Sequence, residues 1–372
     1  MRKLAYSAAL VSVLLNSYAF AQEAAPQNPS TTPPTASASD SDISFSGYLE
    51  GSYNYLSKGS KFTSGTPSRA FDTEKNGFSL QQLAFTLSKL PKEGLGGLVS
   101  ITAGKDADVL NSFGWGDGTN NNFDVTQVYA QYATGPFTII GGKFVTLAGA
   151  EVNNSVNNMQ YSRSYLFELG PYTHTGVRGT YAVNDTLNVI AGVNRGWDVV
   201  QETNTSKTLE LGVAYTPSKK YALNATLYTG KERVGGWVES GPEGTRNLFD
   251  VVGTYNATDK LSFIVDAAYG SQANTDNGTA KWGGIAGYTN YQINDKWRIS
   301  GRLEYFDDKD GYRTGVQQKL KEGTVTLAYL PTKAVELRTE VRADRSNVAS
   351  FADGNDAGKS QYQVAVQALY KF

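Results

Sequence analysis

The sequence predicts an all-β fold: a transmembrane antiparallel β-barrel of about 16 strands, with an inward-folded long loop after strand 5. Three observations lead to this prediction. Apolar and polar residues alternate in many short segments, the connections between these segments alternate in length, and the chain begins with an export signal. The composition agrees, because 23 Tyr, 16 Phe and 39 Gly suit strands and tight turns better than helices.

Bulk properties exclude several classes of protein. A mean hydropathy of −0.38 excludes a bundle of apolar transmembrane helices. Past residue 21, no segment reaches the roughly 20 apolar residues that a spanning helix needs. The formal net charge of −1 gives no electrostatic footprint for nucleic acid, so no nucleic-acid partner is expected. The absence of Cys excludes a disulfide framework, a thiolate metal site and a cysteine nucleophile.

The first 42 residues precede the alternating pattern. Arg2 and Lys3 come before an apolar run over residues 4–15, and Ala19 and Ala21 supply the small residues of a cleavage site, so residues 1–21 are interpreted as a signal peptide. Residues 22–42 are rich in Pro, Ser and Thr and have no large apolar side chain to bury. They are expected to form a disordered periplasmic tail, followed by an outer-membrane barrel over residues 43–372.

Alternating segments follow one another from Ile43 to the end of the chain, as strands with one apolar and one polar face require. They are expected from residue 43 and then at 76–90, 95–106, 123–134, 137–148, 173–183, 187–198, 207–217, 221–231, 246–257, 261–272, 280–293, 296–307, 317–330, 334–345 and 360–372.

The connections between these segments alternate in length. Short ones are rich in turn-forming residues, such as Gly135-Pro136 and Asn184-Asp185. Long ones are expected at 57–75, 107–122, 149–172, 199–206, 232–245, 273–279, 308–316 and 346–359. Short turns at one end and long loops at the other are typical of an outer-membrane barrel.

The strand that begins at Ala334 shows why the polar face of the predicted strands must contact water. Val335, Leu337 and Val341 share one parity. The other parity carries five charged residues in a row: Glu336, Arg338, Glu340, Arg342 and Asp344. A row of charges cannot face a dry core, because each charge would carry an uncompensated desolvation cost. It faces either bulk water or a water-filled lumen.

The final strand alternates in the same way and stops on Phe372. A terminal aromatic residue of this kind resembles the closing strand by which the barrel-assembly machinery recognises outer-membrane barrels. Because an unpaired sheet edge is not tolerated in hydrocarbon, the first and last strands should pair with each other.

About sixteen strands enclose a water-filled channel, which predicts passage of small hydrophilic solutes. Parity and position in the long loop select the candidate pore-lining and constriction residues. They are Lys143, Glu151, Arg163, Glu168, His174, Arg178, Asp266, Arg302, Glu304, Arg338, Glu340 and Arg342. If basic residues on the wall face acidic residues on the loop, they would create an electric field across the narrow part of the pore. Alternatively, these charges solvate the lumen or pair with each other.

Three other functions remain open at this stage. A sugar-selective channel would need a track of lumen aromatics, and Tyr48, Tyr129 and Tyr228 share the inward parity. A surface binder would use the long loops over a plugged barrel. A hydrolase would need partners for His174, and the sequence shows none; with one His and no Cys, no metal site or cofactor is expected and the chain is not expected to be an enzyme.

The central third of the chain resembles the β-barrel porins of Gram-negative bacteria that are described as OmpL-like. The resemblance rests on five stretches: Gly142-Lys143-Phe144, Gly149 with Glu151, Tyr161-Ser162-Arg163-Ser164, His174-Thr175-Gly176-Val177-Arg178 and Asn194-Arg195-Gly196-Trp197-Asp198. It implies an outer-membrane channel for small solutes that is surrounded by outer-membrane lipids. By analogy, it also implies that the protein assembles into a homo-oligomer. General diffusion porins also place their constriction loop after the fifth strand, although this chain lacks their acidic PEFGG-type signature.

Overall fold

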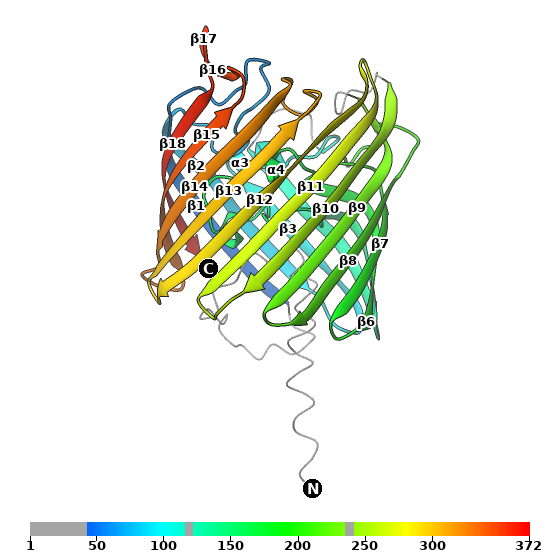
Figure 1. Cartoon of the computed structure of the whole chain (residues 1–372). Coiled ribbons are helices and arrows are strands. Elements are labelled where there is room, and N and C mark those ends of the chain that lie inside the picture. Colours follow the sequence, from blue (N-terminus) through cyan, green and yellow to red (C-terminus); the bar gives the residue numbers. More distant parts are fainter. Residues whose placement is uncertain (1–42, 116–121, 235–241) are drawn as a thin grey trace.

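The computed structural model describes residues 43–115, 122–234 and 242–372. Within them, sixteen strands close into an antiparallel barrel in which neighbours along the chain are neighbours in the sheet (Figure 1). The predicted signal peptide and tail lie outside the described residues. Among the described residues, no helix has the length and apolar character that crossing a membrane requires.

The barrel strands agree with the predicted segments to within a few residues at most ends. They are β1 (Ser44–Leu56), β2 (Asn76–Lys89), β3 (Gly94–Ala103), β4 (Phe123–Thr134), β5 (Phe137–Val145), β6 (Thr173–Asn184), β7 (Leu187–Asn194), β8 (Thr208–Ser218), β9 (Tyr221–Arg233), β10 (Glu243–Asn256), β11 (Leu261–Thr275), β12 (Gly278–Asn294), β13 (Trp297–Asp308), β14 (Gln318–Tyr329), β15 (Val335–Ser346) and β18 (Ser360–Lys371).

The remaining elements lie in the long connections. They are α3 (Lys105–Leu110), the 3-10 turn η2 (Ser155–Asn157), α4 (Tyr165–Glu168) and the hairpin β16 (Phe351–Asp353) with β17 (Asp356–Gly358). The hairpin stands at the end of the barrel opposite to the C-terminus (Figure 1). The sequence analysis did not anticipate α3 or this hairpin.

One expected long connection is short. β11 and β12 extend past the predicted segment ends and leave only Asp276 and Asn277 between them. The positive φ angles of Asn274 (60°) and Gly278 (91°) allow the chain to reverse there. Residues of this kind favour a tight hairpin, so the prediction of a loop over 273–279 was wrong.

The first and last strands pair with each other and close the sheet. Tyr48 on β1 lies opposite Lys371 on β18, and the register continues to Leu56 opposite Gln363. Phe372 extends the pairing, because its N–H donates to the carbonyl of Gly47 at 2.9 Å and its carbonyl accepts the N–H of Gly47 at 2.8 Å. The predicted closure is therefore confirmed.

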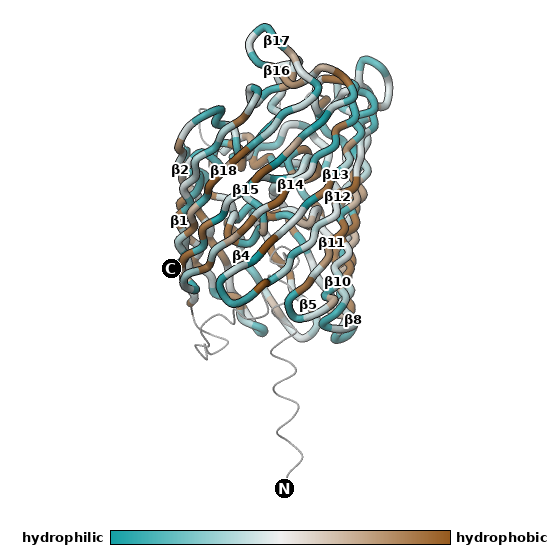
Figure 2. The backbone as a smooth tube through the Cα atoms, turned by 60° about the vertical axis from the view of Figure 1, so that its left-hand side comes forward, coloured by the Kyte–Doolittle hydropathy of each residue, from teal (hydrophilic) through white to brown (hydrophobic). Residues whose placement is uncertain are grey.

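The two faces of the barrel wall differ in the expected way. On β15, Leu337 and Val341 are exposed, while the five charged residues from Glu336 to Asp344 are buried. On β13, Leu303 is 72% exposed while its neighbours Arg302 and Glu304 are buried. Figure 2 shows this alternation of hydrophobic and hydrophilic residues along the strands. In a closed barrel the buried polar face is the inner face, and the apolar face points outward.

Candidate functional site

Residues 146–172 connect β5 to β6, and we call them the β5–β6 segment. Hydrogen bonds between residues close in sequence fix the conformation of this segment. The side-chain amide of Asn158 donates to the carbonyl of Val152 at 2.7 Å and accepts the N–H of Val152 at 2.9 Å. Ser164 is the N-cap of α4, because its hydroxyl accepts the N–H of Phe167 at 3.1 Å. The segment therefore has a defined structure although it contains no barrel strand.

Two glutamates of the inner face accept pairs of backbone N–H groups from this segment. Glu340 on β15 accepts the N–H groups of Tyr161 and Ser162 at 2.7 and 2.9 Å. Glu304 on β13 accepts those of Tyr165 and Leu166 at 2.7 and 2.8 Å. The latter two are among the first N–H groups of α4, which have no partner within the helix. Both wall carboxylates thus hold the segment by charge-assisted hydrogen bonds.

Two aspartates on neighbouring strands hold the beginning of the segment. Asp250 on β10 accepts the N–H of Gly149, and Asp266 on β11 accepts the N–H of Ala150, both at 2.9 Å. Gly149 has a φ of 92°, a conformation that side chains disfavour, and this bend directs successive N–H groups at the two carboxylates. Asp266 was predicted as a site residue, whereas Asp250 was not.

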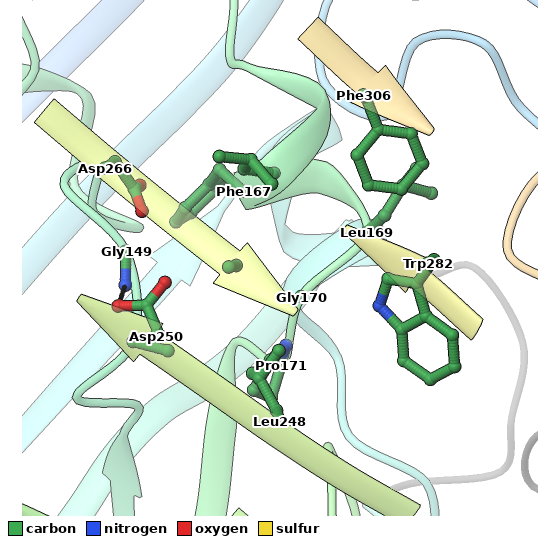
Figure 3. Close-up of a pocket in the computed structure, with 13 residues that line it drawn as sticks. Gly149, Phe167, Leu169, Gly170, Pro171, Leu248, Asp250, Asp266, Trp282 and Phe306 are labelled. Atoms are coloured by element: carbon green, nitrogen blue, oxygen red, sulfur yellow. Dashed lines mark hydrogen bonds between the residues drawn. The ribbon is translucent and has the colours of Figure 1, made fainter. Parts of the chain in front are cut away.

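Figure 3 shows the cavity beside this contact, between the β5–β6 segment and strands β10 to β13. Its volume of about 20 Å³ is room for about one water molecule. Asp250 and Asp266 form one wall, and Phe167, Trp282 and Phe306 contribute apolar surface (Figure 3). The cavity is therefore a packing gap beneath the segment rather than a site for an organic solute.

Three wall arginines bond carbonyl groups of the segment. Arg302 on β13 donates to the carbonyl of Ser162 at 2.8 Å, Arg338 on β15 to that of Gln160 at 3.2 Å, and Arg342 on β15 to that of Arg163 at 2.5 Å. Each arginine is also ion-paired. The pairs are Arg302 with Glu151 and Glu322, Arg338 with Glu336, and Arg342 with Asp344 and Glu322. The positive charges of these three arginines are thus compensated within the protein.

The three charged candidates of the segment itself have different surroundings. Glu151 pairs with Arg302 at 2.7 Å. Arg163 donates to the carbonyl of Tyr161 and the hydroxyl of Ser155, and its guanidinium lies 5.4 Å from the ring centre of Phe71. Glu168 has a buried Oε1 atom that finds no hydrogen-bond partner among the residues that the structure describes. Burial, together with the nearby Asp72 carboxylate, raises the pKa of Glu168 to about 8.

Lys143, His174 and Arg178 lie on β5 and β6, away from the β13–β15 contacts. Lys143 pairs with Asp124 at 3.0 Å, and Arg178 pairs with Glu210 at 2.5 Å. His174 stacks on Tyr228 at 4.4 Å, and its Nδ1 lies 2.9 Å from the carbonyl of Gly196.

The predicted candidates that lie on the barrel strands therefore fall into two groups on the inner face, and the other three belong to the segment itself. One group holds the β5–β6 segment to the far wall, and the other forms pairs beside its own anchoring strands. No three His, Cys, Asp or Glu side chains within residues 43–115, 122–234 and 242–372 are arranged to hold a metal ion.

The three inward tyrosines do not form a continuous aromatic track. Tyr228 is fully buried, and its hydroxyl accepts the N–H of Leu147 at 2.9 Å. Tyr48 hydrogen-bonds Gln82. Tyr129 is half-buried on β4. These side chains support the β5–β6 segment or the wall, which gives no support to a sugar-selective track.

The sequence analysis missed the contribution of residues 57–75, the connection between β1 and β2. Arg69 is buried and pairs with Asp344 on β15 and with Asp72. Phe71 packs on Phe167 of α4, with ring centres 5.9 Å apart. The pattern of this connection is polar and irregular, so only its two phenylalanines, Phe62 and Phe71, give a local signal that it folds against the barrel.

The comparison of the chain with protein-family models decides its family. Residues 42–372 match the family described as "Putative beta-barrel porin-2, OmpL-like". The chain belongs to this porin family. It is therefore an outer-membrane porin, and both its family and its fold point to a channel rather than to an enzyme. The family predicted from the central motifs is confirmed.

Solved structures of outer-membrane channels share the fold. The channel DcaP of Acinetobacter baumannii has a TM-score of 0.61 at 13% identity, covering 89% of this chain and 97% of that one. OmpT of Vibrio cholerae has a TM-score of 0.59 at 13% identity, covering 90% and 99%. The anion-selective porin from Comamonas acidovorans has a TM-score of 0.62 at 14% identity, covering 89% and 100%. No curated protein sequence matches the chain.

Proposed function

We propose that this porin passes small hydrophilic solutes and ions passively, through an aqueous pathway whose waist is formed by the β5–β6 segment folded into the lumen. The number of strands supports an aqueous channel, because barrels of 16 to 18 strands leave one while barrels of eight are filled by side chains. The polar inner face supports passage of hydrophilic rather than apolar solutes.

The observation that carries the proposal is the set of hydrogen bonds from the segment to the opposite wall. Glu304, Glu340 and Arg302 bond main-chain groups of residues 161–166, although the segment starts and ends on β5 and β6. Arg302, Arg338 and Glu340 are each only 1% exposed. A segment that covers the wall charges in this way reduces the open cross-section at its own level.

Deleting residues 153–166 tests the waist. Single-channel conductance in a planar lipid bilayer is expected to rise, because the deletion removes the chain that bonds Glu340 and Arg302. Folding is checked by the change in gel mobility on heating. A correctly folded deletion variant with unchanged conductance would refute the waist.

A second variant tests the same point without shortening the chain. In Glu304→Gln with Glu340→Gln, the charged acceptors of four backbone N–H groups become neutral. We expect larger conductance and more frequent current fluctuations. Glu243→Gln is the matched control, because Glu243 pairs with Arg233 at 3.3 Å and forms no bond with the segment among the described residues. An equal response of both variants would count against the proposal.

Assembly into a homo-oligomer stays a prediction. One of the matched structures, OmpT of Vibrio cholerae, is described as a trimer form and has a TM-score of 0.58 at 14% identity. We propose the same kind of self-association for this porin. Chemical cross-linking of the folded protein in membranes tests it, and a monomer band alone would contradict it.

A further inference from the structure

Five side chains form a closed ring at the long-loop end of the barrel. Arg246 lies near the start of β10 and Trp282 near the start of β12. Trp197 belongs to the connection between β7 and β8, and Tyr312 and Arg313 belong to the connection between β13 and β14. Each residue contacts the next, and we call this set the arginine–aromatic ring.

The contacts around the ring can be followed one by one. The guanidinium of Arg246 lies 5.1 Å from the ring centre of Trp197. Arg313 lies 5.8 Å from Trp197 and 5.6 Å from Trp282. Trp282 stacks on Tyr312 with centres 5.4 Å apart. The hydroxyl of Tyr312 accepts a hydrogen bond from Arg246 at 2.9 Å, which closes the ring.

Neither guanidinium of the ring has a counter-ion among the described residues. In the part of the chain that the structure describes, no carboxylate oxygen lies within 4.0 Å of a guanidinium nitrogen of Arg246 or Arg313, although Asp308 accepts the backbone N–H of Arg313 at 3.0 Å. Arg246 donates to the side-chain oxygen of Gln272 at 2.7 Å and to the carbonyl of Arg233 at 3.1 Å. The Nε atom of Arg313 is buried and has no hydrogen-bond partner within residues 43–115, 122–234 and 242–372. The wall arginines at 302, 338 and 342 differ, because each is ion-paired.

The nearest carboxylates are engaged elsewhere. Asp198 accepts the N–H groups of Tyr172 and Thr173 at 2.9 and 2.8 Å. Asp308 accepts the N–H of Thr314 at 2.7 Å, and Glu232 accepts the hydroxyl of Thr208 at 2.8 Å. These groups attenuate the positive charge of the ring from a distance but do not pair with it.

The ring holds two positive charges close together without a paired negative charge among the described residues. Both guanidiniums stack on one indole, so their charges repel each other across a short distance. Burial, together with the charge of Arg246, lowers the pKa of Arg313. Cation–π contacts compensate part of the cost of holding the two charges together. The remaining N–H donors suit a planar or tetrahedral oxyanion, which guanidinium groups bind with two parallel hydrogen bonds.

We propose that the arginine–aromatic ring binds an oxyanion, a carboxylate or phosphate group carried by a small solute, at the long-loop entrance of the porin. The role in transport rests on the proposed channel function, whereas the binding itself does not. Arg313 is only half-buried, so part of its side chain is accessible to solvent. An oxyanion held there would be concentrated at the mouth of the pathway that the β5–β6 segment narrows.

Tryptophan fluorescence of the folded barrel in detergent tests binding without requiring conduction. Trp197 and Trp282 are two of the five Trp residues, and both contact Arg313. Titration with sodium acetate and with inorganic phosphate distinguishes the carboxylate from the phosphate source, and sodium chloride of equal ionic strength is the reference. A saturable change with acetate or phosphate beyond that of chloride is expected. Its absence with both would overturn the proposal.

The variant Arg246→Gln with Arg313→Gln removes both charges. We expect the apparent dissociation constant to rise about tenfold or more, since hydrogen bonds to charged groups are lost. Arg313→Lys keeps the charge but loses the planar fork, and an intermediate loss is expected. Arg195→Gln is the matched control, because Arg195 lies in the same connection as Trp197 and already faces Glu202 at 3.9 Å. Unchanged binding in the folded double variant would overturn the proposal.

Planar-bilayer recordings separate this proposal from the channel function. In the wild-type porin, the oxyanion that binds should reduce the chloride current in a saturable way, and the double variant should lose this effect. Binding by fluorescence with no channel openings would refute the channel and leave the ring as a binding site. Channel openings with no saturable binding would refute the ring and leave the channel.

Discussion

Glu151 of the β5–β6 segment and Arg302 of β13 form an ion pair at 2.7 Å, with both side chains almost completely withdrawn from solvent. The second oxygen of Glu151 accepts the N–H of Ser164 at 2.7 Å. Arg302 also pairs with Glu322 of β14 at 2.7 Å. One buried arginine thus joins the segment to two strands of the opposite wall. Glu322 also pairs with Arg342 at 3.7 Å, whereas Glu151 has no second ion-pair partner among the described residues.

These ion pairs predict an asymmetry between two substitutions. Arg302→Gln leaves Glu151 and Glu322 buried without that partner, and breaking a buried pair costs about 3–5 kcal/mol of unfolding free energy. Glu151→Gln leaves Arg302 paired with Glu322, so a smaller loss is expected. Urea unfolding of the protein in lipid vesicles measures both. Lys207→Gln, which breaks the exposed pair with Glu202, should cost no more than about 1 kcal/mol. Equal losses at positions 151 and 302 would contradict the assigned partners.

The carboxyl group of Glu168 predicts a dependence on pH. Its pKa is raised to about 8, first by burial and then by Asp72, while Arg342 and Arg69 oppose the rise. Because the folded pKa exceeds the unfolded value of 4.5, the stabilising contribution is complete below that value and is lost as the pH rises through about 8. Ionisation then places a second negative charge beside Asp72. We expect conductance to increase between pH 6 and 9.5.

Glu168→Gln is the control for this effect, because it keeps a neutral side chain of similar size at every pH. The conductance step centred near pH 8 should disappear in this variant, while slower changes from other groups remain. A step that persists unchanged in Glu168→Gln would assign it to a different residue.

The outward parity of β15 predicts a depth-dependent cost of charge. Val341 is 51% exposed on the apolar face near the middle of the strand, and Val335 lies on the same face at its end. An arginine at the bilayer midplane costs about 2–4 kcal/mol, and one near the interface about 0–1 kcal/mol. Val341→Arg should therefore lower the unfolding free energy in vesicles much more than Val335→Arg. Equal costs would mean that this face does not contact hydrocarbon.

The sequence predicted the strands well because their signal is local. On β15 and β18, most residues of one parity are apolar and most of the other are polar. The structure confirms the faces, and it confirms the bounds to within one residue. The contacts that the long loops make with distant strands gave no local signal in the sequence. Arg69 pairs with Asp344, 275 positions away, and the two meet only because the closed barrel brings β15 near the β1–β2 connection. The arginine–aromatic ring draws on four segments and was missed for the same reason.

The tight turn between β11 and β12 shows a different limit. The residues Asn274 to Gly278 read equally well as a loop or as a hairpin, since Asn, Asp and Gly favour both. The positive φ angles that decide between them appear only in the folded chain. The alternation of short and long connections predicted a long loop at residues 273–279. The backbone conformation of Asn274 and Gly278 instead produces a tight turn.

The last residue supplies a final prediction, because Phe372 closes the barrel in two separable ways. Its backbone exchanges two hydrogen bonds with Gly47, and its ring lies 5.7 Å from Phe85 and 5.8 Å from Tyr370. A Cβ atom at position 47 would lie 2.5 Å from the Phe372 ring, so Gly47 leaves the space that this ring occupies. Closure therefore depends on both main chain and side chain.

Phe372→Ala removes the ring and keeps the two backbone hydrogen bonds, whereas deletion of Phe372 removes both. At about 0.5–1.5 kcal/mol for each hydrogen bond, deletion should cost about 1–3 kcal/mol more than Phe372→Ala. Urea unfolding in vesicles gives the free energies. The yield of folded protein in membranes of living cells reports recognition by the assembly machinery, which we predict to depend on the ring. A yield that falls on deletion but not in Phe372→Ala would show that main-chain closure alone is what assembly requires.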